Sequence, residues 1–243
     1  MRMLTFSKRC LKEILRDPVN LFFGLGFPVV LLLLLSAIQA NIPVELFAIE
    51  SLAPGISVFG LSFITLFSAT LVAKDRESSF LQRLYTTPLR PHEFIFGYML
   101  PLVPISVMQS AVCYILAVIL GMPITVNIVF AVLMMIPVSV LYISLGLLCG
   151  SLCGVKQAGG LCGGLFTNLS AWLSGVWFDL SLIGGAFEKL AHALPFVHAV
   201  ELERAIISGE YSGIGTHVLI VIGYAAVTAV LAVTVFLKQM KKQ

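Results

Sequence analysis

The sequence predicts an all-α membrane protein with six transmembrane helices. Three observations carry this prediction: a mean hydropathy of +1.03, a charged content of 11%, and five long windows without a single Asp, Glu, Lys or Arg. A charge-free apolar run of about 18 or more residues is typical of a membrane-spanning helix. These windows are Pro18 to Val44, Ser51 to Ala73, Phe94 to Val155, Gln157 to Phe178 and Tyr211 to Leu237.

The longest window is too long for one crossing, and the turn signal Gly121-Met122-Pro123 divides it into two. All residues therefore fall into a single transmembrane domain, 1–243. The predicted spans are about 20–40, 52–73, 95–120, 127–151, 157–177 and 214–237.

The distribution of basic residues predicts the orientation. With six spans and both termini inside, all but two of the 15 Lys and Arg fall in cytoplasmic segments, the exceptions being Lys189 and Arg204. This is the bias that the positive-inside rule describes. We therefore expect a multi-pass protein of the cell membrane with both termini cytoplasmic. The net charge of +3 reflects this bias and does not indicate nucleic-acid binding.

The first residues predict an amphipathic helix, 3–17, lying in the inner membrane interface. Its expected apolar face holds Leu4, Leu11, Ile14 and Leu15, and its basic face holds Lys8, Arg9, Lys12 and Arg16. Asp17-Pro18 is expected to end it, because proline disfavours helical geometry in the residue before it. The helix either only anchors the topology or also transmits motion.

A second short amphipathic helix is predicted in the cytoplasmic loop from Lys74 to Glu93. Phe80 and Leu84 are four residues apart, as are Leu81 and Tyr85, so they form one apolar stripe that ends before Thr87-Pro88. Two interpretations stay open. The helix lies on the membrane surface, or it docks into a groove on a soluble partner.

The fifth predicted span begins with two overlapping GxxxG pairs, Gly159/Gly163 and Gly160/Gly164. Missing side chains let another helix approach closely. The partner helix lies either within this chain or in a second copy of it, and the motif alone does not decide between them.

The segment from Asp179 to Gly213 is too short for a domain and predicts two short helices on the outer side. Phe187, Leu190, Ala191 and Leu194 mark the first, Val197, Val200 and Ile207 the second, and Pro195 separates them. Because such apolar helices do not stand free in water, we expect them to re-enter the outer bilayer, covered by the spans. Trp172 and Trp177 fall where an outer aromatic belt belongs.

Motif searches return no catalytic signature. There is no GxxxxGK[ST], HExxH or GxSxG, so no bound ATP, cofactor or metal is expected in this chain. No carboxylate is expected at mid-membrane depth, which argues against a proton- or sodium-coupled pump. A lipid-modifying enzyme stays as an alternative, resting on the outer polar residues Glu188, His192, His198, Glu201 and Glu203. A metal site there is a lesser option than ordinary interfacial polarity.

Several segments taken together resemble the permease subunits of ABC exporters of the second permease class, which includes antibiotic, lipid and polysaccharide exporters. The matching segments are Lys12-Glu13-Ile14-Leu15-Arg16-Asp17-Pro18 with Phe27-Pro28, Asp75-Arg76-Glu77 with Arg83-Leu84-Tyr85-Thr86-Thr87-Pro88-Leu89, Ser174-Gly175, and Leu194-Pro195-Phe196 with His198-Ala199, Glu201 and Arg204. They follow the family's order. One departure is that Trp177-Phe178-Asp179 follows Ser174-Gly175 where relatives often carry a proline.

The resemblance implies a permease that pairs with a second copy or a paralogue and is driven by separate ATPase subunits, which would bind ATP and Mg²⁺. It implies three sets of site residues. The residues implied to contact the ATPase are Arg9, Lys12, Arg16, Asp75, Arg76, Glu77, Phe80, Leu81, Arg83, Leu84 and Tyr85. Dimer packing falls to Gly159, Gly160, Gly163 and Gly164, and the outer gate to Phe187, Leu190, Leu194, Pro195 and Glu201.

The expected substrate is a small amphipathic or drug-like molecule. No large outer domain interrupts the chain, and the spans are not rich in the tyrosines that a sugar channel would need. A sensor or immunity subunit that uses ATPase partners without moving a substrate stays as a further alternative.

Overall fold

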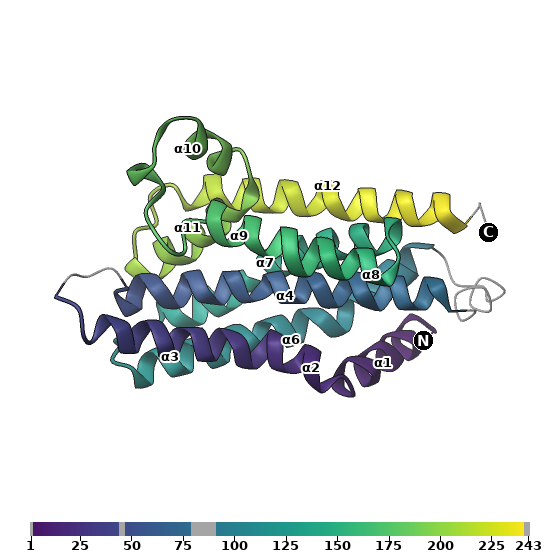
Figure 1. Cartoon of the computed structure of the whole chain (residues 1–243), viewed down its shortest axis with the longest axis horizontal. Helices are drawn as coiled ribbons and strands as arrows, with labels where there is room; N and C mark the ends of the chain where they lie inside the picture. The colour runs from purple at the N-terminus through teal and green to yellow at the C-terminus, as the bar shows by residue number, and fades with distance from the viewer. Residues whose placement is uncertain (1, 44–46, 79–90, 241–243) are drawn as a thin grey trace.

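The computed structural model describes residues 2–43, 47–78 and 91–240, and every regular element in this part is a helix (Figure 1). The elements are α1 (Arg2–Leu15), α2 (Pro18–Leu21), η1 (Phe22–Gly26), α3 (Phe27–Gln39), α4 (Ile49–Glu77), α6 (Pro91–Ile119), α7 (Asn127–Leu152), α8 (Val155–Ala158), η2 (Gly159–Phe166), α9 (Thr167–Leu173), η3 (Leu180–Leu182), α10 (Gly185–His192), α11 (Pro195–Ser208) and α12 (Ile214–Met240).

Five helical segments of the described part are long and apolar enough to cross a membrane. They are Pro18–Gln39, Ile49–Glu77, Glu93–Ile119, Asn127–Leu152 and Ile214–Gln239. They correspond to the first four and the last of the six predicted spans. The predicted turn is also confirmed, since Gly121 adopts a φ of 111° between α6 and α7.

The fifth predicted span is helical but is not among these five. It runs through α8, η2 and α9 from Val155 to Leu173, and it packs along α4. Its glycines and polar residues, including Lys156 and Asn168, lower its hydropathy relative to the other spans. The eight residues of η2 form a π-helix, a rare geometry that is frequent at functional sites.

Helix α4 lies at the centre of the bundle and is the most buried of the five candidate spans. Gly146 and Gly150 of α7 face its backbone, and a side chain at either position would collide with the carbonyl of Thr65 or Ala69. The close approach lets Thr65 Oγ1 donate to the Tyr142 carbonyl at 2.9 Å. This GxxxG pair, which the sequence reasoning overlooked, is therefore a true helix-packing motif.

The first candidate span starts irregularly. Asp17 caps α2 by accepting from the backbone N–H of Asn20 at 3.1 Å, and Pro18 occupies the first turn, as predicted for the end of α1. Pro28 has no N–H to donate to the carbonyl four residues earlier. The preceding turn widens into the π-helix η1, where the N–H of Phe27 bonds the carbonyl of Phe22.

Helix α1 packs on α6 through a face that differs from the predicted one. Phe6 and Cys10 are buried with Ile14, whereas Leu4 and Leu15 are 51% and 55% exposed. The Phe6 ring lies against Tyr98 at a centroid distance of 4.9 Å, in the space that Gly97 leaves by lacking a side chain. Of the predicted apolar face, Ile14 packs inside the protein while Leu4 and Leu15 stay exposed, so the buried face of α1 is rotated relative to the predicted one. The placement of α1 in the membrane interface stays a prediction.

The two ends of the bundle differ in content (Figure 1). Helix α1, the last turn of α4, α8 and the end of α12 lie at one end, hereafter the α1 end; α10 and α11 lie at the other, the α10 end. Both of these short helices were predicted between Asp179 and Gly213, and their place on the outer side stays a prediction. Pro195, expected to separate them, forms the first turn of α11, and Gly209 ends that helix with a φ of 76°.

Candidate functional site

A buried carboxylate organises the α1 end. Asp75, in the last turns of α4, is 2% exposed and receives three hydrogen bonds. Arg9 of α1 donates to it through both guanidinium nitrogens, at 2.6 and 2.7 Å, and the Tyr98 hydroxyl of α6 donates at 2.8 Å. Bidentate arginine–carboxylate pairs are among the strongest side-chain interactions. These three residues, the Arg9–Asp75–Tyr98 clamp, tie α1, α4 and α6 together.

Neighbouring charges extend the clamp. Arg9 also pairs with Glu13 at 2.9 Å, and Lys74 lies 3.6 Å from Asp17. Burial opposes the charge on Arg9, but the hydrogen bond and the negative charge of Asp75 outweigh it and raise the pKa of the guanidinium. Burial raises the pKa of Glu13. The end of α4 is thus joined to the middle of α1 and to Asp17, which follows α1.

Arg76 and Glu77 hold the corner between α7 and α8. Arg76 Nη1 donates to the carbonyl of Gly150 at 2.9 Å and to that of Cys153 at 3.3 Å, where a cation suits the partial negative charge of a helix C-terminus. Glu77 Oε1 accepts from the N–H of Val155 at 2.7 Å, at the start of the next helix. Gly154 leaves room for this carboxylate.

The predicted ATPase-contacting residues therefore divide into three groups. Asp75, Arg76 and Glu77 belong to α4 rather than to a separate loop helix, and their side chains bond within the chain, as does Arg9 of α1. Lys12 of α1 and Arg16, directly after that helix, are exposed. The remaining predicted residues, Phe80, Leu81, Arg83, Leu84 and Tyr85, lie outside the described residues.

The four predicted packing glycines differ in their surroundings, because one packs within the chain and three have nothing opposite them. Gly163 packs on Leu66 of α4, so this member of the cluster serves packing within the chain. Gly159, Gly160 and Gly164 have no atom opposite them within 4 Å. Around them, large apolar side chains of η2 and α9 are exposed, namely Leu161 (40%), Leu165 (56%), Leu169 (40%) and Trp172 (55%).

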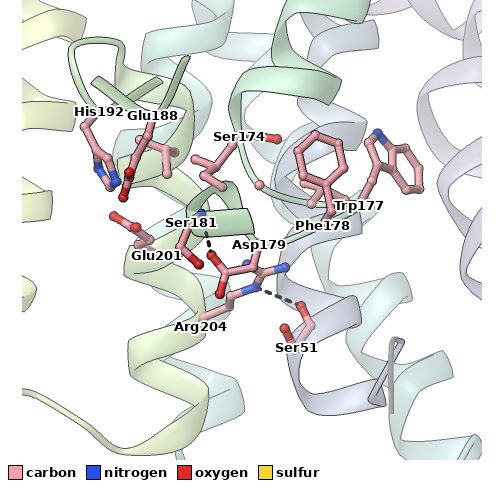
Figure 2. A pocket seen from close by; sticks show the side chains of 14 residues that line it. Ser51, Ser174, Trp177, Phe178, Asp179, Ser181, Glu188, His192, Glu201 and Arg204 are labelled. Carbon is pink, nitrogen blue, oxygen red and sulfur yellow. Dashed lines mark hydrogen bonds between the residues drawn. The ribbon is translucent and has the colours of Figure 1, made fainter. Parts of the chain in front are cut away.

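A polar pocket of about 390 Å³ occupies the α10 end, between α11, η3 and the start of α4 (Figure 2). Arg204 of α11 reaches across it and donates from Nε to the Ser51 carbonyl at 3.1 Å. Asp179 faces this guanidinium in Figure 2 and accepts from the N–H of Ser181 at 3.0 Å. That backbone hydrogen bond, aided by the charge of Arg204, lowers the pKa of Asp179.

The predicted gate residues surround this pocket only in part. Glu201 lines it, as do Glu188 and His192, which point toward the same space in Figure 2. Phe187 and Leu194 pack beside it in a small apolar cluster with Leu173 and Val197. Pro195 is buried, and Leu190 is 54% exposed.

One buried carboxyl was not assigned to the protein interior from the sequence. Glu203 of α11 is 0% exposed; its Oε2 accepts from the Tyr114 hydroxyl of α6 at 2.9 Å, and its Oε1 has no hydrogen-bond partner among the described residues. Burial raises the pKa of Glu203 to about 8, although the Tyr114 hydrogen bond opposes the rise. The signal was present in the sequence, because Glu203 is flanked by Leu202 and Ile206 in an apolar helical pattern.

The fold and its two polar ends define a polytopic helical membrane protein whose central helix is bonded to its neighbours at the α1 end. The model of the ABC-2 type transporter family matches residues 1–208, from α1 through α11. The chain therefore belongs to the ABC-2 type transporter family, as a membrane permease component. None of the curated proteins matches it. Permeases of this family are typically non-catalytic and generally work with an ABC ATPase.

Proposed function

We propose that this chain is the membrane-spanning subunit of an ATP-driven exporter and that the α1 end receives the motion of cytoplasmic ATPase subunits. The Arg9–Asp75–Tyr98 clamp is the observation that carries the proposal. Residues 79–90 come directly after Ser78, the residue that caps α4. A partner bound to them therefore acts on a helix end that is bonded to α1, α6, α7 and α8. Such an end moves its neighbours with it rather than bending alone.

The proposed topology has six crossings with both termini cytoplasmic. In it α8, η2 and α9 form the fifth crossing, and the glycine-rich π-helix is covered by other helices rather than by lipid. The positive-inside bias supports the α1 end as the cytoplasmic one. It follows that α10 and α11 lie on the outer side.

A second copy of the chain is proposed to pack on the open glycine face. Gly160 and Gly164 have nothing opposite them, and their neighbours Leu161 and Leu165 expose large apolar surfaces. A translocation path at this seam would be mainly apolar with a polar component such as Asn168, which supports a small amphipathic substrate. Phe187, Leu194 and Glu201 would close its outer end.

The test of the function is purification of the tagged chain in mild detergent, followed by mass spectrometry and an ATPase assay. The proposal expects a P-loop subunit to co-purify and to hydrolyse ATP, and expects reconstituted vesicles to move a drug-like substrate. A chain that purifies without an ATPase would contradict the proposal. An active ATPase complex that moves no substrate would favour the sensor alternative.

The dimer face has its own test. Gly164→Leu places a bulky side chain on the proposed seam and should sharply reduce the dimer fraction, measured by native mass spectrometry in nanodiscs. Gly223→Leu is the matched control, because Gly223 of α12 is equally exposed and has no atom opposite it within 4 Å. Equal dimer fractions in the two variants would show that the dimer interface does not lie on the face of Gly160 and Gly164.

A further inference from the structure

Three helices bring imidazole and carboxylate groups together at the α10 end. His192 ends α10, His198 and Glu201 lie on α11, and His217 lies in the first turn of α12. His192, His198 and Glu201 each bring a ligand atom within 4.8 Å of the others. His217 Nδ1 lies 3.0 Å from His198 Nδ1 and 3.4 Å from Glu201 Oε2. Imidazole nitrogens and a carboxylate oxygen are common ligands of zinc.

The spacing of three of these atoms fits one metal ion. The separations between His198 Nδ1, His217 Nδ1 and Glu201 Oε2 are 3.0, 3.4 and 3.7 Å. Ligand atoms at about 2.0–2.1 Å from a tetrahedral zinc ion lie about 3.3–3.4 Å apart. A single ion at the centre of this triangle would therefore need only small shifts of the side chains.

The hydrogen bonding of His198 orients the required lone pair. Its Nε2 lies 2.9 Å from the backbone carbonyl of His192, which only accepts, so Nε2 carries the proton. In the neutral imidazole Nδ1 then carries the lone pair, and it faces His217 and Glu201. Metal-ligating histidines usually donate their other ring N–H to a carbonyl or carboxylate in this way. Without a metal, His217 Nδ1–H donates to His198 Nδ1, and a bound cation takes the place of that proton.

The cluster is reachable from solvent. It borders a cavity of about 700 Å³ whose lining includes Glu50, Glu201 and Glu210, with Arg204 as the basic side chain facing them. The Arg204 side chain is directed to the Ser51 carbonyl, so Glu201 remains available to the histidines. His198 is 9% exposed, whereas His217 and Glu201 are 24% and 34% exposed, which leaves an open side for a water molecule or for His192.

We propose that His198, His217 and Glu201 bind a divalent transition metal ion of the zinc class, with His192 or water as the fourth ligand. The ion joins α11 to the start of α12 beside the outer pocket. This goes beyond the proposed transport function, since the metal is a resident of the outer end and not a requirement for ATP hydrolysis.

The experiment uses the full chain, together with its ATPase if one co-purifies, stripped with a chelator and then exposed to micromolar Zn²⁺. After removal of unbound metal, the zinc content and the thermal midpoint are measured. The wild type should keep about one ion per chain, and zinc should raise its thermal midpoint. Co²⁺ in place of zinc should give the intense visible absorption of a tetrahedral site.

The variants separate a metal site from a plain hydrogen-bonded cluster. His217→Ala and Glu201→Gln should each lose the bound ion and the zinc-induced stabilisation. Glu210→Gln, which changes a carboxylate of the same cavity outside the cluster, should keep both. A wild type that retains no zinc would overturn the proposal, and so would zinc content that is unchanged in His217→Ala. A purely structural role for the histidines would lower the metal-free thermal midpoint and leave zinc content at zero throughout.

Discussion

The α1 end and the α10 end of the bundle each contain a buried carboxylate, and the two carboxylates differ in how fully they are hydrogen-bonded. At the α1 end Asp75 receives three hydrogen bonds from two other helices, and Arg76 and Glu77 bond the corner between α7 and α8. At the α10 end Ser174 Oγ and Glu203 Oε1 are buried without partners among the described residues, and two cavities lie side by side. Arg76 Nε at the α1 end is also buried without a partner among these residues, but Asp75, which links three helices, is bonded on both carboxylate oxygens. This bonding of Asp75 favours motion of the three helices as one body, whereas the half-bonded Glu203 leaves the α10 end easier to rearrange.

The comparison has a mechanical meaning for a transporter. A signal from an ATPase must enter where the helices are firmly connected, because a loose contact would absorb the motion. In the proposed topology the α10 end is the outer end, which opens and closes, so its contacts must be separable at low cost. The distribution of polar contacts in this chain matches that division of work.

Asp75→Ala should have the largest effect, because it removes the firm connection that distinguishes the α1 end from the α10 end. It removes the acceptor of Arg9 and Tyr98, and hydrogen bonds to a charged group contribute about 1.5–3 kcal/mol each. We expect a thermal midpoint lower by several degrees and a loss of ATP-driven transport, measured on the purified complex and on vesicles. Tyr98→Phe removes one hydrogen bond and leaves the arginine pair, so it should have a much smaller effect. Equal and mild effects of both variants would contradict the clamp.

Arg76→Ala and Glu77→Ala should uncouple ATP hydrolysis from transport. The loss of stability should be smaller than for Asp75→Ala. Each removes contacts at the α7–α8 corner, so α4 should no longer carry α8 with it. ATP hydrolysis should continue while transport falls, and the protein should still reach the membrane. Lys12→Ala, at an exposed position on α1, is the control for a simple change of charge. Normal transport in both corner variants would remove their coupling role.

Glu203→Gln should change the pH dependence of stability at the α10 end. Burial raises the pKa of Glu203 to about 8 from an ordinary value of 4.5, so the folded state binds the proton more tightly than the unfolded state. Stability from this group is greatest at low pH and is lost as the pH rises toward and through 8. The wild-type thermal midpoint should fall between pH 6 and pH 9. The fall in thermal midpoint should be smaller in Glu203→Gln, because glutamine stays neutral at every pH. Identical slopes of thermal midpoint against pH in the two proteins would contradict a raised pKa for Glu203.

Asp179→Asn should have the smallest effect. Asp179 is exposed, and it caps the short η3 helix at the rim of the outer pocket. Transport and stability should change little, since asparagine also caps helices well. A severe transport defect would indicate that the facing Arg204 needs this charge and that the α10 end is less adaptable than proposed.

The sequence was sufficient for the helical class, for five apolar spans and for the two short helices between Asp179 and Gly213, because charge-free apolar runs and proline or glycine stops act locally. It was insufficient for tertiary pairing. The apolar stripe of α1 with Leu4 and Leu15 predicted a membrane face, yet Phe6 and Cys10 turn toward α6. The GxxxG pair that packs α7 on α4, Gly146 and Gly150, was not singled out from the sequence, and the predicted role of Gly159–Gly164 in dimer packing stays a prediction.

The residues of the candidate site at the α1 end could be predicted from the sequence, but the contacts that they make could not. Arg9, Asp75, Arg76 and Glu77 were all expected at the cytoplasmic side, whereas their bonds inside the chain depend on helices distant in sequence. Tyr98 and Tyr114 gave no sequence signal, because a tyrosine in an apolar span is ordinary until its partner carboxylate is known. His217 was separated from His198 by a helix boundary, so only the fold brings the two rings together.

The reactivity of Cys10 tests the clamp most directly. Cys10 of α1 is 0% exposed, and burial raises the pKa of its thiol to about 12, so both access and thiolate content are low. In a variant with Cys10 as the single cysteine, the account predicts slow labelling by a maleimide in the complete clamp and much faster labelling after Asp75→Asn frees α1. Fast labelling with the clamp intact, or an unchanged slow rate after Asp75→Asn, would contradict it.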